Sequence, residues 1–207
     1  SYWKGQSRLN NSSIGIEIVN DTYCHRAKDV MQEGNADWPS QTFCFYPDYP
    51  ETQIAVVIEL VRDILARYPE IKPTHVVGHS DIAPQRKIDP GPRFPWHRLY
   101  RMGIGAWYDD DTVARYWEQF RTGLPSVLQM QSALEAYGYK IELTGEDDEQ
   151  SRNVLRAFQF HFLPWRVTGE INVETAAVLY AMVEKYYPKE LDALLPVAAA
   201  ADTPPVE

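Results

Sequence analysis

A change of hydrophobic period between two early segments constrains the fold of this chain more than any other feature. Residues 13–20 alternate with a period of two and place isoleucines on one face, which predicts a strand. Residues 51–68 instead repeat apolar side chains at steps of three and four, which predicts an amphipathic helix stopped by Pro69. Residues 74–78 form a short apolar run and are predicted to be a second strand.

Two irregular segments separate or follow these elements. Residues 21–50 carry Gly, Asn, Asp and Pro and are predicted to be a long loop, a length that is often functional. Residues 79–95 are rich in proline and are predicted to contain no regular structure. A strand that ends in a loop dense with His, Asp, Lys and Arg is a common support for a functional site.

Cys24 and Cys44 lie within the long loop and allow two interpretations. A disulfide between them would add about 3 kcal/mol in an oxidising compartment through loop closure. Two reduced, buried thiols fit the pattern equally well, so the pair alone does not identify the compartment.

The remainder of the chain is predicted to be helical. A short helix over 112–121 precedes Gly123 and Pro125, which mark a domain boundary. Residues after about 195 are predicted to be a disordered tail. Three further helices are predicted over 126–137, 148–162 and 172–187.

An internal repeat links the last two of these helices. Thr-Gly-Glu at 144–146 recurs at 168–170, with Ser or Thr, Val and Leu following at the same spacing. Asp148 and Asn172 fall at equivalent positions, where their side chains can accept from the first free N–H groups of a helix. Each unit is therefore predicted to be a tight glycine turn followed by a capped helix.

Composition excludes some classes of function. The net charge of −9 argues against a nucleic-acid partner, because phosphate binding requires a surplus of Lys and Arg on some face. No apolar run approaches the roughly 18 to 20 residues that span a membrane. The 207 residues suffice for one or two domains with a sizeable core.

Four residues could carry chemistry. His79 and Asp89 lie on one irregular loop, and imidazole nitrogen and carboxylate oxygen are good zinc ligands. Lys87 could stabilise the negative charge of a tetrahedral intermediate beside the metal. Glu17 lies in the middle of the first predicted strand, opposite the isoleucine face; it either faces solvent or serves as a general base in an active-site groove.

The segment GHSDIAPQRKIDPGPRFPWHRLY (78–100), preceded by SIGIEIVN (13–20), resembles the type 2 N-acetylmuramoyl-L-alanine amidases. The match is nearest the branch of AmpD-like and AmiD-like enzymes of Gram-negative bacteria, and it covers residues 1–100. The resemblance implies a mixed α/β sheet flanked by helices, and hydrolysis of the amide between N-acetylmuramic acid and L-alanine. It further implies that His79 and Asp89 bind zinc, that Glu17 is the acid/base, and that Lys87 assists at the transition state.

Residues 127–183 resemble the small three-helix peptidoglycan-binding domain. The expected organisation is thus an amidase catalytic domain over 1–122, a peptidoglycan-binding domain over 123–190 and a disordered tail over 191–207. The expected partners are peptidoglycan or muropeptides. No polar wall-binding site follows from the sequence of the three helices, whose apolar side chains are expected to form their core.

The chain departs from the family at the first zinc ligand, a histidine that the family takes from an early strand. His75 lies four positions before His79, roughly 13 Å away along an extended strand, and is too distant to share a metal without a bend. His25 could approach the site through the long loop. His97 is expected to pack or face solvent beside Trp96, and His161 to belong to the helical domain. We expect a chain lacking the first strands of its amidase domain, which would bind zinc poorly and be weakly active.

The sequence leaves two other functions open. One is a non-catalytic wall-binding protein or inactive amidase fragment, and the other is an interaction module of a larger assembly, hinted at by the acidic residues 109–111. The chain starts without Met and without a visible signal peptide, which suggests the middle of a protein. The resemblance implies the periplasm of a Gram-negative bacterium, with a lipid anchor upstream and outer-membrane association as options.

Overall fold

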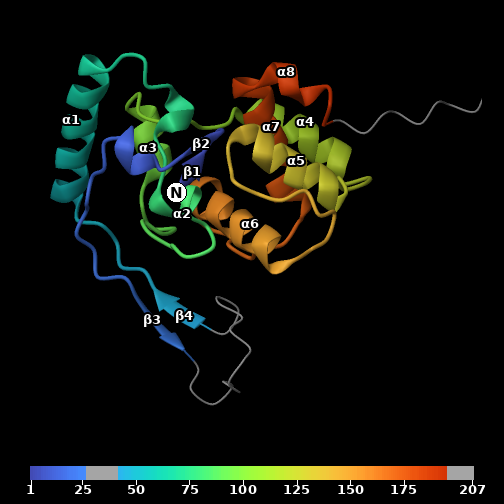
Figure 1. The fold of residues 1–207 in the computed structure, drawn as a ribbon, viewed down its shortest axis with the longest axis horizontal. Helices are drawn as coiled ribbons and strands as arrows, with labels where there is room; N and C mark the ends of the chain where they lie inside the picture. Colours follow the sequence, from blue (N-terminus) through green and yellow to red (C-terminus); the bar gives the residue numbers. More distant parts are fainter. Residues whose placement is uncertain (27–41, 195–207) are drawn as a thin grey trace, which may run out of the picture.

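Helices dominate the structure, a computed structural model that describes residues 1–26 and 42–194 (Figure 1). The strands are β1 (Tyr2–Trp3), β2 (Gln6–Ser7), β3 (Tyr23–Arg26) and β4 (Thr42–Phe45), paired antiparallel as β1–β2 and β3–β4. The longer helices are α1 (Glu51–Arg67), α4 (Asp110–Phe120), α5 (Val127–Tyr137), α6 (Glu149–Phe162) and α7 (Val173–Tyr186). The shorter ones are η1 (Leu9–Asn11), η2 (Pro73–His75), α2 (His79–Ile82), α3 (Trp96–Arg101) and α8 (Pro188–Leu191). None of the helices in these described ranges is long and apolar enough to cross a membrane.

Helix α1 confirms the predicted amphipathic helix and forms one edge of the molecule (Figure 1). Its buried face is the apolar stripe identified from the sequence, Ile54, Val57, Ile58 and Val61. The opposite face is exposed, as the three- and four-residue spacing requires.

The predicted strand over 13–20 is wrong. These residues pair with no strand in the described part of the chain, and Ile14 and Val19 are 50% and 81% exposed. A side-chain contact ties the segment to α1 instead: the Gln53 amide donates to the Val19 carbonyl at 2.8 Å. A period of two selects the extended conformation, but a strand also needs a ladder partner.

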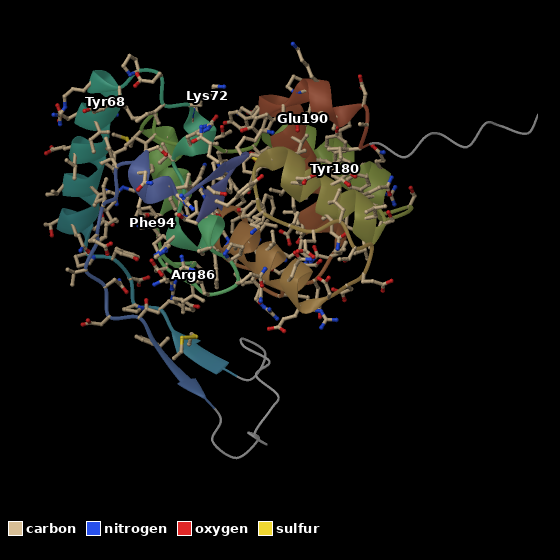
Figure 2. The ribbon with its side chains drawn as sticks, viewed as in Figure 1. Tyr68, Lys72, Arg86, Phe94, Tyr180 and Glu190 are labelled. Carbon is tan, nitrogen blue, oxygen red and sulfur yellow. A yellow bond between two sulfur atoms is a disulfide. The ribbon has the colours of Figure 1, made fainter. Side chains whose placement is uncertain are left out.

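Three other local predictions also need correction. The predicted strand over 74–78 begins within the 3₁₀ turn η2, because Pro73 starts a helical turn and the His75 N–H donates to the Lys72 carbonyl. The segment 79–95, predicted to be irregular, begins with the one-turn helix α2. The predicted loop over 21–50 contains the hairpin β3–β4, whose directly paired Cys24 and Cys44 form a disulfide (Figure 2). Part of that loop lies outside the described residues.

The helices α5, α6 and α7, together termed the helical unit (residues 127–186), confirm the predicted C-terminal helices and their repeat. Asp148 accepts from the Ser151 N–H and Asn172 from the Thr175 N–H, so both cap their helices as predicted. Each Thr-Gly-Glu turn has its glycine at positive φ, +75° at Gly145 and +74° at Gly169. Helix α4 was likewise predicted, and it starts earlier than expected, at Asp110.

The apolar core is continuous from the N-terminal hairpin to the helical unit. Trp3 packs edge-on against Tyr139, with ring centroids 4.9 Å apart, and its indole N–H donates to the Thr74 carbonyl at 2.8 Å. Helix α4 packs on α7, where Phe120 meets Tyr180 edge-on at 4.9 Å. The domain limits at 122 and 190 stay predictions, and the predicted tail falls mostly on residues 195–207, outside the described chain.

Candidate metal and catalytic site

The candidate site is built on residues 78–92, here termed the site loop. The loop begins at Gly78, the residue before helix α2, where a Cβ atom would lie 2.7 Å from Pro90 Cδ and 3.3 Å from Trp96. Only glycine therefore allows the two arms of the loop to approach this closely. The Ser80 N–H also donates to the Asp89 carbonyl at 2.8 Å, which fastens the two arms together.

This close approach brings the two predicted metal ligands together. His79 Nδ1 lies 2.9 Å from Asp89 Oδ2, and both side chains are partly exposed. In a tetrahedral zinc site with bonds of about 2.0–2.2 Å, neighbouring ligand atoms lie about 3.3 Å apart. The pair therefore fits a zinc ion as two adjacent ligands. Within residues 1–26 and 42–194, however, no group of three or more His, Cys, Asp or Glu side chains could hold a metal.

The structure gives fewer contacts for the two predicted catalytic residues, Lys87 and Glu17. Lys87 lies two residues before Asp89, is half-buried, and its backbone N–H donates to the Ala83 carbonyl at 3.1 Å. Glu17 is exposed in the unpaired segment 13–20. Within the described ranges, no hydrogen bond or ion pair joins Glu17 to His79, Lys87 or Asp89. The roles of all four residues stay predictions.

The other histidines occupy different surroundings. The side chain of His25 lies outside what the structure describes. His75 belongs to the turn η2 and not to a strand; burial, Lys72 and Lys4 lower the pKa of its imidazole. His97 is exposed and lies against Trp107, with ring centroids 5.1 Å apart.

His161 takes part in a buried cluster that the sequence did not reveal. Asp81, two residues after His79, is 1% exposed and accepts hydrogen bonds from the Gly78 N–H at 2.7 Å, the Tyr139 hydroxyl at 2.6 Å and His161 Nδ1 at 2.8 Å. Burial, with the Asp81 charge as a second cause, raises the pKa of Tyr139 well above its ordinary value. The two donors from the helical unit are 58 and 80 positions away, so no local pattern links them to Asp81.

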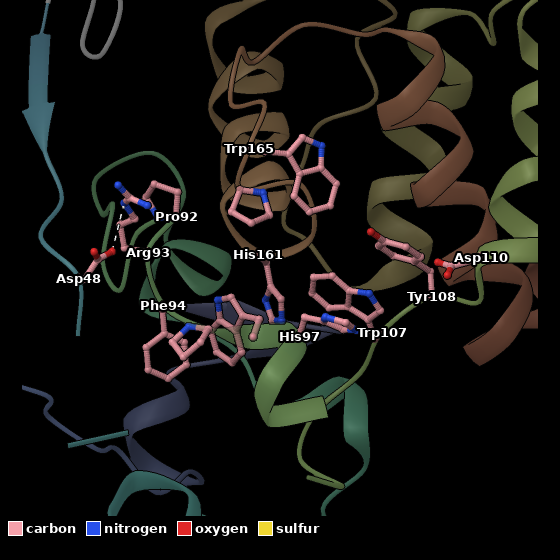
Figure 3. A pocket seen from close by; sticks show the side chains of 13 residues that line it. Asp48, Pro92, Arg93, Phe94, His97, Trp107, Tyr108, Asp110, His161 and Trp165 are labelled. Carbon is pink, nitrogen blue, oxygen red and sulfur yellow. Dashed lines mark ion pairs between the residues drawn. The ribbon is translucent and has the colours of Figure 1, made fainter. Parts of the chain in front are cut away.

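A pocket of about 400 Å³ lies beside the site loop (Figure 3). Aromatic rings from two parts of the chain form much of its wall: Trp107 stacks on Tyr108 at 4.9 Å, and Trp165, which follows α6, is 61% exposed. Arg93 at its edge pairs with Asp48 at 3.5 Å. The other residues lining it are Pro92, Phe94, Pro95, Trp96, His97, Asp110, His161 and Pro164.

Two stretches of the chain match known protein families. Residues 2–92 match the N-acetylmuramoyl-L-alanine amidase family, and residues 124–179 match a peptidoglycan binding domain. The N-acetylmuramoyl-L-alanine amidase AmiD of Escherichia coli is 40% identical over 187 residues, which are 90% of this chain and 62% of that protein. The chain thus spans less than two thirds of this relative's length.

Among the solved structures that resemble the fold, two are complexes with an anhydromuramic peptide. One is AmpDh3 of Pseudomonas aeruginosa in complex with anhydromuramic pentapeptide, at 45% identity and a TM-score of 0.77, covering 89% of this chain and 67% of that one. The other is E. coli AmiD with anhydro-N-acetylmuramic acid-L-Ala-D-gamma-Glu-L-Lys, at 38% identity and a TM-score of 0.74, covering 89% and 66%. The predicted fold class, an amidase fold followed by a small helical domain, is thereby confirmed.

Proposed function

Because the chain belongs to the N-acetylmuramoyl-L-alanine amidase family, we propose that the whole protein hydrolyses the amide between N-acetylmuramic acid and L-alanine in peptidoglycan. His79 and Asp89 would hold a zinc ion, together with a further ligand that the described residues do not supply. The observation that carries this proposal is the 2.9 Å separation of His79 Nδ1 and Asp89 Oδ2.

The chemistry of the proposed reaction divides between a zinc ion and two residues, Glu17 and Lys87. A zinc ion, when bound, supplies a Lewis acid and lowers the pKa of a water molecule. The Glu17 carboxylate accepts a proton from the attacking water and returns it to the alanine nitrogen as the C–N bond breaks. The Lys87 ammonium stabilises the negative charge that develops on the carbonyl oxygen. Glu17 must approach the site loop for this role.

The pocket supports binding of a wall fragment next to the scissile bond. Its wall joins residues from Pro92 onward, at the end of the site loop, to the end of α6, so both family segments contribute to it. The exposed ring of Trp165 suits the apolar face of a sugar ring, and the charged edge suits hydroxyl and amide groups. We propose peptidoglycan or released muropeptides as the substrate class.

A periplasmic location in a Gram-negative bacterium also remains a proposal. The Cys24–Cys44 disulfide supports it, because disulfides persist in oxidising compartments. Anchoring through a lipid upstream, and association with the outer membrane, remain further options of the same proposal.

Stem-peptide release from purified sacculi by the whole protein tests the proposed activity. We expect release to stop on addition of a chelator and to return with zinc. Glu17→Gln should lower the rate about 10²- to 10⁴-fold, as loss of a general base does. Glu59→Gln, at an exposed carboxylate on α1, is the matched control and should leave release unchanged. Binding to sacculi without any release would overturn the enzyme proposal in favour of a non-catalytic wall binder.

A further inference from the structure

The carboxylate of Asp81 connects the site loop to the helical unit. At 1% exposure a carboxylate is costly unless its oxygens are hydrogen-bonded. Oδ2 accepts from the Gly78 N–H and from His161 Nδ1, and Oδ1 accepts from the Tyr139 hydroxyl. Because a carboxylate can only accept, Nδ1 of His161 carries the proton of this hydrogen bond.

This connection reaches the two proposed metal ligands through the backbone. Gly78, whose N–H is held by Asp81, directly precedes His79. Ser80 directly follows His79, and its N–H holds the carbonyl of Asp89 at 2.8 Å. The Asp81 side chain is therefore bonded to the backbone segment that carries His79, and the next residue of that segment is bonded to Asp89.

A second set of contacts fastens the same loop to α6. The Gln85 amide donates to the Gln150 carbonyl at 3.1 Å and accepts from Asn153 Nδ2 at 2.9 Å. In addition, the His161 ring stacks on Trp96 at 3.9 Å, and Trp96 lies against Gly78. The helical unit thus contacts the site loop at Gly78–Asp81 and again at Gln85.

We propose that the helical unit positions the metal-binding loop, with Tyr139 and His161 acting through Asp81 as positioning residues for His79 and Asp89. The helical unit then has a role in the active site besides any affinity for the wall. The part of this inference that concerns metal binding and catalysis rests on the proposed function.

A matched pair of tyrosine variants in the whole protein tests this inference. Tyr139→Phe removes one buried hydroxyl that bonds Asp81, whereas Tyr180→Phe removes one buried hydroxyl that bonds the Leu194 carbonyl at 3.1 Å. For Tyr139→Phe we expect a zinc dissociation constant raised about tenfold, in the range seen for outer-shell partners of metal ligands. We also expect a lower kcat with unchanged KM, and faster hydrogen exchange at the Gly78 and Ser80 amides. Tyr180→Phe should change none of these.

A pair of substitutions at His161 provides the rescue test. Asn places an amide N–H near the position of Nδ1, so His161→Asn should retain zinc affinity close to that of the parent. His161→Leu removes the donor and should weaken zinc binding as Tyr139→Phe does. Should Tyr139→Phe match Tyr180→Phe in zinc affinity and hydrogen exchange, or should His161→Asn bind zinc as weakly as His161→Leu, the inference is overturned.

Hydrogen exchange separates this inference from the proposed function, because it requires neither zinc nor activity. If the parent protein binds no zinc and releases no peptide, the proposed function fails. In that case faster exchange at Gly78 and Ser80 in Tyr139→Phe would still support positioning by the helical unit, and exchange equal to that of Tyr180→Phe would overturn it.

Discussion

Single residues set how tightly the N-terminal hairpin and the helical unit can pack. Gly138 follows α5 at φ +149°, and its N–H donates to the Leu134 carbonyl. A Cβ atom there would lie 2.9 Å from the Trp3 ring, which is itself buried. The Gly138 carbonyl also accepts from the Lys4 N–H at 2.8 Å. The absence of a side chain at one position thus permits the contact between two distant segments.

We expect Gly138→Ala to destabilise the protein by about 2–3 kcal/mol, because it combines overpacking against Trp3 with an unfavourable positive φ. Gly123→Ala is the control, since no heavy atom lies within 4 Å of its added Cβ, and it should change stability by less than about 0.5 kcal/mol. Urea unfolding of both variants measures the difference. Equal stabilities of the two variants would show that the Trp3 ring can shift without lowering the free energy of unfolding.

Buried tyrosines make stability sensitive to alkaline pH. Burial raises the pKa of Tyr180 from 10.0 to about 12, so the folded state keeps its phenol protonated where the unfolded chain would ionise. This contribution is fully present below pH 10 and is lost as the pH rises through about 12. Tyr180→Phe should therefore lose less stability than the parent between pH 9 and pH 11.5, measured as the change in urea midpoint. Tyr68→Phe, which alters an exposed ring, should lose as much stability as the parent. A loss in Tyr180→Phe equal to that of the parent would contradict the assignment of this pH dependence to Tyr180.

At the scale of elements, two buried glutamines explain why the Thr-Gly-Glu turn occurs twice. Gln131 on α5 accepts from the Gly145 N–H and donates to Ser151 Oγ, both at 2.8 Å. Gln159 on α6 accepts from the Gly169 N–H at 2.7 Å and donates to Thr175 Oγ1 at 3.1 Å. Each amide therefore joins a turn to the first residues of the capped helix that follows it. The repeat in sequence is a repeat of this hydrogen-bonded unit.

Gln159→Leu should destabilise the protein by about 2–4 kcal/mol, because it leaves the Thr168 and Gly169 N–H groups without their acceptor in a buried turn. Gln119→Leu, on the exposed face of α4, should change stability by less than about 0.5 kcal/mol. Thermal or urea unfolding provides the comparison. A small effect at Gln159 would mean that water or a rearranged turn satisfies these groups.

Elements set by local signals were the ones predictable from sequence. Helix α1, the helices of the helical unit and the caps at Asp148 and Asn172 depend on neighbours within a few residues, and all are confirmed. The strand over 13–20 failed because a strand depends on a partner that its own sequence does not specify. The hairpin β3–β4 was missed because its strands are short and lie in a segment rich in turn residues.

The same distinction between local and distant contacts applies to the candidate site. His79 and Asp89 share one loop, so their proximity could be expected from the motif, and the structure brings them to 2.9 Å. The partners of Asp81 come from α6 and from the residues after α5, and only the tertiary fold reveals them. Glu17 lies in a segment that pairs with no strand among the described residues, so its catalytic role stays a prediction.

In the molecule as a whole, residues before the predicted domain boundary at 123 pack against residues after it at more than one place. Helix α4, which precedes it, packs on α7 through Phe120 and Tyr180, and Arg115 pairs with Glu184 at 2.6 Å. Trp3 packs between η2 and the end of α5. The two family segments therefore share one core and are not two bodies joined by a free linker.

A single cut in the exposed connection around Gly123 should consequently leave the two fragments associated. A protease site inserted there in the whole protein allows the test, with native mass spectrometry or gel filtration as the readout. We expect one species of unchanged mass under native conditions and two fragments in denaturant. Separation of the fragments without denaturant would show that the shared core does not hold them together.

The buried contact at Asp81 also has a consequence for how such proteins diverge. Asp81 belongs to the segment inherited with the amidase family, and Tyr139 and His161 to the segment inherited with the wall-binding family. A recombination that exchanged the second segment for an unrelated one would leave a buried carboxylate without two of its donors. Substitutions at these three positions should therefore occur together across lineages. Amidases without a helical unit should either supply other donors to the residue at position 81 or carry a different residue there.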